Sequence, residues 1–145
     1  VLSGDYVIAS ERAKFVSAYT SSGLTPDGSS TYYLAKHVGL LRAKELMLTN
    51  RVLTADEAQA WGLVNKVVPT ETVMDEARAM AQCIASGPTK AFGGVKRLLD
   101  TAFSDGLETQ LDRETRSIAD MMRTADGPAG IAAFLAKETP RFEGK

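Results

Sequence analysis

The loop around Asp27 carries the side chains whose types and spacing best suit acid–base chemistry. Pro26, Asp27 and Gly28 place a carboxylate in a turn just before an expected helix start. Such a carboxylate can act as a general base when it lies within hydrogen-bond reach of a substrate and is shielded from water. Tyr19 brings a phenol to the same loop, where it could orient a polar group of the substrate. The pattern also suits an ordinary turn, because proline, aspartate and glycine each favour turn geometry.

A second candidate pair lies near the end of the chain. Phe134 and Lys137 stand three positions apart on the last expected helix, so a continuous helix would place them on one face. One interpretation is a core aromatic residue beside a solvated lysine. The other is an aromatic surface and a cation that receive the ring and a phosphate of a nucleotide. The spacing alone does not choose between them.

Composition excludes several classes of protein. The 145 residues are 44% hydrophobic and 24% charged, with a formal net charge of −1, which indicates an ordinary globular chain without a basic face for nucleic acid. Cys83 and His37 are single residues of their type, so an internal disulfide and a multi-histidine metal site are excluded. We expect Cys83 to be a buried thiol and His37 a structural histidine. No apolar run is long enough to span a bilayer.

The elements that must position these residues follow from turn and capping signals. We expect a strand at residues 6–9, a loop at 17–30, and a helix capped by Ser29 or Ser30 and interrupted at Gly39. Thr54 and Glu57 form a capping-box pattern that opens a short helix, and a strand is expected at residues 64–68. Helical periodicity fills most of the remainder, with a break at residues 87–88. The chain therefore divides near residue 70 into a mixed part and a helical part.

Five segments in order resemble the enoyl-CoA hydratase/isomerase family of the crotonase superfamily. They are residues 5–15, 23–31, 38–51, 55–69 and 130–137, of which 55–69 is the most specific. The resemblance implies an α/β fold: an N-terminally truncated crotonase-like spiral core whose remaining part is residues 1–70, and a helical C-terminal trimerisation region at 71–145. It also implies that the chain is the C-terminal portion of a longer protein. The oxyanion-hole amides and most of the acyl-CoA groove would then lie upstream.

The resemblance further implies an acyl-CoA thioester substrate. Coenzyme A would enter as part of that substrate, and no other cofactor and no metal are expected. Asp27 is then the catalytic base, and Tyr19, Leu24 and Pro26 line the substrate pocket. Phe134 and Lys137 are then the residues that bind the CoA part of the substrate. A homotrimer or dimer of trimers and a cytoplasmic location are expected, without a nucleic-acid or membrane partner.

The residue type at position 19 distinguishes the enzymes of this family from one another. Hydratases use two glutamates, one of which would fall before Val1, and the other aligns with Tyr19. Tyrosine cannot replace that carboxylate, so the resemblance favours an enoyl-CoA isomerase in which Asp27 alone moves the proton on an enolate held by an oxyanion hole. Aryl-CoA dehalogenases, where the aspartate is a nucleophile and an aromatic residue stands at the Tyr19 position, are one alternative. An enoyl-CoA hydratase is another. An inactive fragment that serves only as an oligomerisation module is the third.

Overall fold

Two segments that lie far apart in the sequence pair in a short parallel sheet. In the computed structural model, which describes residues 1–145, β1 (Ile8–Ser10) pairs with β4 (Lys66–Val68), and Ala9 lies opposite Val67. A second, antiparallel pair joins β2 (Lys14–Phe15) to β3 (Leu53–Thr54). The expected strands are therefore present, although each is shorter than its sequence pattern and begins two residues later. All four strands belong to one compact unit, Val1–Arg78.

The long helix that follows the Asp27 loop is broken in its middle. α1 (Ser30–Thr49) contains Gly39 with φ 79° and ψ 163°, a conformation that glycine adopts without the clash a side chain would bring. The interruption expected from the sequence is thus confirmed. The expected serine cap is wrong, because Ser29 itself has a left-handed backbone (φ 63°) and its side chain makes no cap hydrogen bond. The hydroxyl of Ser30 donates instead to the carbonyl oxygen of Asp27, at 2.8 Å.

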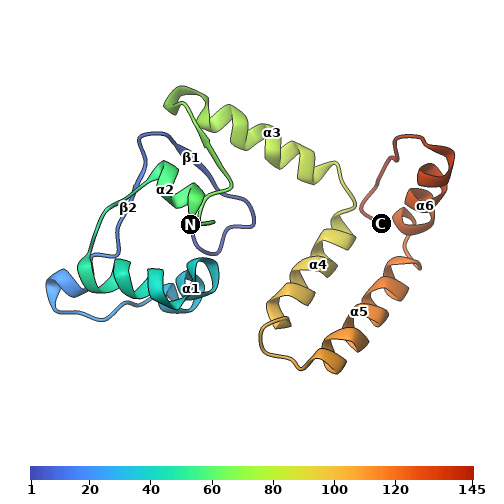
Figure 1. Cartoon of the computed structure of the whole chain (residues 1–145). Coiled ribbons are helices and arrows are strands. Elements are labelled where there is room, and N and C mark those ends of the chain that lie inside the picture. The colour runs from blue at the N-terminus through green and yellow to red at the C-terminus, as the bar shows by residue number, and fades with distance from the viewer. The chain divides into compact units, whose positions relative to one another are not determined.

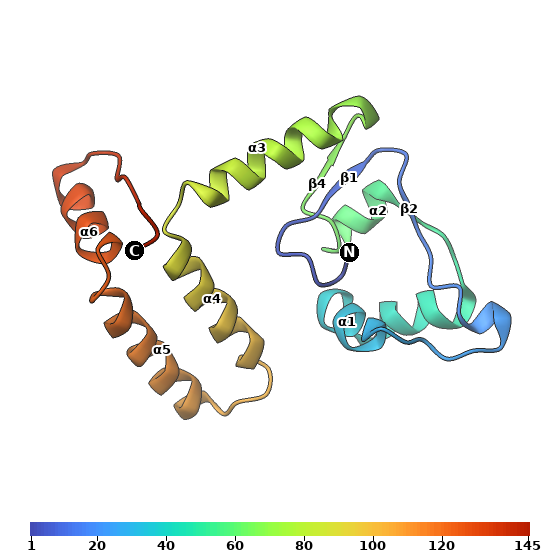
Figure 2. The same ribbon diagram turned by 180° about the vertical axis from the view of Figure 1, so that it is seen from behind.

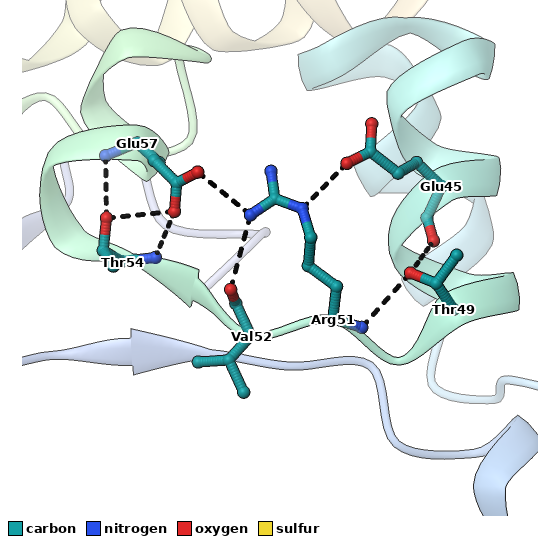
Figure 3. A network of polar contacts seen from close by, with 6 residues as sticks. All are labelled: Glu45, Thr49, Arg51, Val52, Thr54 and Glu57. Atoms are coloured by element: carbon teal, nitrogen blue, oxygen red, sulfur yellow. Dashed lines mark hydrogen bonds and ion pairs between the residues drawn. The ribbon is translucent and has the colours of Figure 1, made fainter.

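A polar network fixes the turn between α1 and α2 (Ala55–Ala60), as Figure 3 shows. The predicted capping box is confirmed: Thr54 Oγ1 accepts from the backbone N–H of Glu57, while the Glu57 carboxylate accepts from the backbone N–H of Thr54. Arg51 then bridges two elements, since Nε donates to Glu45 at 2.8 Å and Nη1 to Glu57 at 2.9 Å. The Thr54 backbone and side-chain hydrogen bonds, followed by Arg51, lower the pKa of Glu57.

The hydrophobic core of this first unit lies between α1, α2 and the strands. Leu53 is completely buried at 0% exposure and is the largest side chain in the unit without solvent contact. Trp61 packs at the edge of the core, and the guanidinium groups of Arg42 and Arg51 lie 4.8 Å and 5.0 Å from its ring centre. The other buried members are apolar and come from several elements: Ala9, Leu34, Val38, Ala43, Leu46, Ala58, Leu63 and Val64.

Helices are the only regular secondary structure in the second compact unit, Ala79–Lys145. α3 (Val73–Ala85) spans the boundary between the units, and α4 (Thr89–Thr101), α5 (Leu107–Met121) and α6 (Asp126–Ala136) follow it (Figures 1 and 2). α4 and α5 pack against each other, with Gly94 buried beside Ser117, where a methyl group would lie 3.2 Å from the serine hydroxyl. The helix break at residues 87–88 is confirmed. The domain division at residue 70 stays a prediction.

The apolar faces expected on these helices are present but are not covered within the unit. Leu99 and Ile118 are 62% and 67% exposed. Cys83 is exposed as well, so the prediction of a buried thiol is wrong: helical periodicity identifies an apolar face but not whether another element packs on it. No helix has both the length and the apolar character to cross a membrane. The structure also contains two short 3-10 helices, η1 (Thr20–Ser22) and η2 (Thr70–Thr72).

Candidate active site

The structure brings the two candidate residues of the loop into direct contact. The phenol of Tyr19 donates a hydrogen bond to Oδ1 of Asp27, and the two oxygens are 2.8 Å apart. The loop folds back between them because the carbonyl oxygen of Tyr19 accepts from the backbone N–H groups of Ser22 and Leu24. Gly23 makes this turn with φ 70°, in the left-handed region that favours glycine. A carboxylate and a phenol are therefore paired at one point of the loop.

Four hydrogen bonds hold this loop at its two ends. At the first end, Thr20 Oγ1 donates to the carbonyl oxygen of Met47 at 2.6 Å, and Nδ2 of Asn50 donates to Thr20 Oγ1 at 2.8 Å. At the other end, the carbonyl oxygen of Asp27 accepts from both the backbone N–H and the hydroxyl of Ser30. Asn50 can serve in this way because it ends α1 in a left-handed conformation. Sequence analysis missed Thr20 and Asn50, since no local pattern links positions thirty residues apart.

A mostly apolar cavity of about 380 Å³ lies beside Tyr19 in the same unit. Tyr19, Ser17, Ser30 and Lys14 are the polar residues of its wall. The remaining lining residues are apolar and come from the chain start, β2 and the residue after it, α1, and the turn between α2 and β4: Val1, Leu2, Phe15, Val16, Leu34, Leu46, Met47 and Leu63. An apolar cavity with a few polar groups is the usual form of a small-molecule site.

The other predicted pocket residues lie beside this cavity rather than in its wall. Leu24, Pro26 and Asp27 are absent from the lining, and Leu24 is 62% exposed. Asp27 is exposed too, and reaches the cavity wall only through its hydrogen bond to Tyr19. His37 is exposed on α1, and its Nε2 lies 2.9 Å from the carbonyl oxygen of Leu2, so its structural role stays a prediction. The roles of these residues toward a substrate stay predictions.

The contact with Asp27 changes the titration of Tyr19. The hydrogen bond to the carboxylate, and then its negative charge, raise the pKa of the phenol above its ordinary 10.0. The folded protein therefore favours the protonated phenol. That contribution to stability is complete below pH 10 and is lost as the pH rises through the raised pKa of Tyr19.

We expect this shift to depend on Asp27. In an ultraviolet absorbance titration, the difference between the wild type and Tyr19→Phe isolates the ionisation of Tyr19 from that of the other three tyrosines. Its pKa should lie above 10.0 in the wild type and fall toward that value in Asp27→Asn. An identical pKa in both proteins would show that the carboxylate of Asp27 does not act on the Tyr19 phenol in solution.

The candidate CoA-binding residues belong to the second unit. Phe134 lies in the last turn of α6 and is 80% exposed. Lys137 follows the last helical residue and has a left-handed backbone with φ 57°, so the helical face expected for the pair ends before it. Its backbone N–H donates to the carbonyl oxygen of Phe134 at 3.1 Å. An exposed aromatic ring and an exposed cation therefore lie close in sequence at the end of α6, in a turn rather than along a helix.

Comparison with known proteins decides the family. The sequence pattern of the enoyl-CoA hydratase/isomerase family matches residues 1–145, the whole of the chain. The chain belongs to the enoyl-CoA hydratase/isomerase family. Among its relatives, 1,2-epoxyphenylacetyl-CoA isomerase of Escherichia coli K12 is 41% identical over 144 residues, which are 99% of this chain and 55% of the relative. 4-Chlorobenzoyl coenzyme A dehalogenase-1 of an Arthrobacter species is 34% identical over 94% of this chain and 50% of its own.

Solved structures of the enoyl-CoA hydratase/isomerase family confirm the crotonase-like fold. The enoyl-CoA hydratase/isomerase of Cupriavidus metallidurans CH34 superposes with a TM-score of 0.92 at 38% identity, over 99% of this chain and 54% of that one. Enoyl-CoA hydratase of Bacillus anthracis gives a TM-score of 0.91 at 33% identity, over 99% and 56%. The chain thus spans about half the length of the family members that it matches.

Proposed function

We propose that the protein is an acyl-CoA isomerase in which the carboxylate of Asp27 moves a proton between two carbon atoms of the acyl group. The observation that carries the proposal is the hydrogen bond between Tyr19 and Asp27, 2.8 Å long. It fixes one oxygen of the carboxylate and leaves the second to face a substrate. The 41% identity to an epoxyphenylacetyl-CoA isomerase supports an isomerase as well.

The proposed step needs one base and a stabilised enolate. Asp27 removes a proton from the carbon next to the thioester carbonyl, the electron pair moves onto the carbonyl oxygen, and the protonated Asp27 returns the proton to another carbon. Backbone amides must hold the negative charge on that oxygen. The proposal assigns them to the part of the family's length that this chain does not span. Tyr19 orients the Asp27 carboxylate during both transfers.

The proposal also assigns residues to the recognition of the substrate. Leu24 and Pro26 flank the acyl group beside Asp27. Phe134 and Lys137 contact the nucleotide of CoA, which enters only as part of the substrate. We also assign the exposed apolar faces of α4 and α5 to a homotrimer or a dimer of trimers, and we expect the protein in the cytoplasm.

Hydrolytic dehalogenation of an aryl-CoA is the second candidate. It is supported by the 34% identity to 4-chlorobenzoyl coenzyme A dehalogenase-1 and by the aromatic residue at position 19. In this reaction the Asp27 carboxylate would attack the ring carbon, the chloride would leave, and water would then hydrolyse the aryl ester to regenerate Asp27. Hydration of a double bond is less well supported, because Tyr19 stands where a second carboxylate would be needed.

Product analysis separates these reactions. The whole protein that contains this chain is incubated with an enoyl-CoA, and the products are followed by mass spectrometry and NMR. An isomerase should move the double bond without a change in mass, whereas a hydratase adds the mass of water. Chloride release from 4-chlorobenzoyl-CoA would instead identify a dehalogenase. Hydration or chloride release without isomerisation would overturn the proposed function.

A further inference from the structure

Asp126 is buried, with only 5% of its surface exposed, and is the single charged residue in that condition. It lies in the first turn of α6, and its two carboxylate oxygens accept hydrogen bonds from the chain end. Oδ1 accepts from the backbone N–H of Glu143 at 2.7 Å, and Oδ2 from that of Gly144 at 2.8 Å. A buried carboxylate without such donors would strongly destabilise the fold. Asp126 and these two amides are therefore mutually dependent.

Further contacts fasten residues 142–145, which we call the C-terminal clasp, to α4 as well as α6. The carbonyl oxygen of Lys145 accepts from the backbone N–H of Ala125 at 2.9 Å. Phe142 lies against Gly130 of α6 and lines a cavity of about 240 Å³ together with Ala91 of α4. Gly144 lies beside Thr89, the first residue of α4. Figures 1 and 2 show the chain turning back after α6 in this way.

The clasp matters because α6 has little other support within the unit. α4 and α5 pack along each other, whereas α6 makes only sparse direct contact with either helix. The junction between α5 and α6 is also closely fitted at Gly127, where an added methyl group would lie 2.2 Å from the carbonyl oxygen of Met121. The direction of α6 is thus set at its beginning, by this junction and by the clasp on Asp126.

We propose that Asp126 is a positioning residue for recognition of the CoA nucleotide. By holding the clasp across the starts of α4 and α6, it gives α6 one orientation and so presents Phe134 and Lys137 at the far end of that helix in a fixed place. This inference rests on the proposed function for the nucleotide contacts. In it, Asp126 does not contact the substrate and affects CoA binding only by fixing the orientation of α6.

The variant Asp126→Asn tests this role with little change in side-chain volume. The amide keeps one acceptor but turns an NH₂ group toward a backbone N–H, so one of the two hydrogen bonds must break. We expect KM for an acyl-CoA to rise about tenfold or more, since small displacements of binding groups have large effects on recognition. Both kcat and the KM for the matching acyl-pantetheine, which lacks the nucleotide, should stay unchanged. Amide hydrogen exchange of residues 142–145 should become faster.

Two further variants keep the test decisive. Asp120→Asn removes an exposed carboxylate from α5 and should alter neither substrate's KM. Phe142→Ala loosens the clasp without touching the buried carboxylate, so it should reproduce the selective rise in KM even if Asp126→Asn fails to fold. The proposal is overturned if faster exchange of residues 142–145 leaves the KM for acyl-CoA unchanged, or if both thioesters are affected equally.

A failure of the proposed function can be told apart from a failure of this inference. If the wild-type protein turns over neither thioester, the proposed reaction is wrong. Calorimetric binding of CoA and of pantetheine to the wild type and to Phe142→Ala then decides the positioning role. Selective loss of CoA affinity in the variant supports it, and equal affinities for CoA in the two proteins overturn it.

Discussion

Replacing Asp27 by asparagine is expected to lower the turnover number for isomerisation by about 10²- to 10⁴-fold, the usual contribution of a general base. The amide has nearly the same shape and its oxygen can still accept the hydrogen bond from Tyr19, but it cannot take up a proton. Binding of the acyl-CoA should therefore remain close to that of the wild type. Steady-state kinetics and calorimetric binding on the same preparations measure the two quantities separately.

A matched substitution controls for the loss of one negative charge. Asp100→Asn removes an exposed carboxylate from α4, far in sequence from the Asp27 loop, and should leave turnover unchanged. If Asp27→Asn turns over as fast as this control, Asp27 has no part in proton transfer. If it loses substrate binding and turnover together, Asp27 shapes the pocket rather than acting as the base.

Truncating Leu53 to alanine is expected to lower the free energy of unfolding by about 2–5 kcal/mol. Leu53 lies in β3, is completely buried, and joins the strands to the core formed with α1 and α2. The change removes apolar contacts and leaves a cavity that close-packed neighbours fill only in part. Urea denaturation followed by circular dichroism measures this change in the free energy of unfolding. The urea concentration at the midpoint should fall, while the dependence of the free energy on urea concentration stays the same.

An exposed leucine supplies the comparison for this change. Leu41 is 84% exposed on α1, and Leu41→Ala should alter stability by less than about 0.5 kcal/mol. Because both variants lose the same atoms, the difference between them reports burial alone. Equal midpoints for the two variants would contradict the position of Leu53 in the core.

Features that depend on neighbouring residues were predictable from the sequence. The capping box of Thr54 and Glu57 closes within one helical turn, so its residue types suffice to identify it. The break at Gly39 was predictable because glycine alone relieves the conformation found there. The break at residues 87–88 is equally local, since a proline disfavours the helical conformation of the residue before it. The serine cap failed because the left-handed backbone of Ser29 depends on the loop that precedes it.

Features that join distant positions were not predictable in this way. Arg51 meets Glu45 of α1 and Glu57 of α2 only because the turn between the two helices brings both carboxylates to its guanidinium group. The burial of Asp126 depends on a chain end that returns to it, and no spacing rule indicates such a return. The exposure of Cys83 shows the same limit, since an amphipathic pattern does not say what covers it.

The candidate site was predictable only in part. Tyr19 and Asp27 were identified by residue type and family resemblance, but their hydrogen bond required the fold of the loop. Thr20 and Asn50, which hold that loop, carry no chemical signal in the sequence. Phe134 and Lys137 were placed on a common helical face, whereas α6 ends before Lys137. Chemistry could therefore be assigned to residues before the geometry that supports it was known.

The break at Gly39 also bears on how one fold can serve several reactions. It separates the half of α1 that follows the Asp27 loop from the half that ends at Asn50, where Arg51 and its partners fix the chain. The loop that carries Tyr19 and Asp27 is thus held at its start by the Thr20–Asn50 contact, and the helical segment after it ends at a glycine joint. Substitutions at the exposed residues of this loop can alter its chemistry while the buried Leu34 and Val38 keep α1 packed in the core.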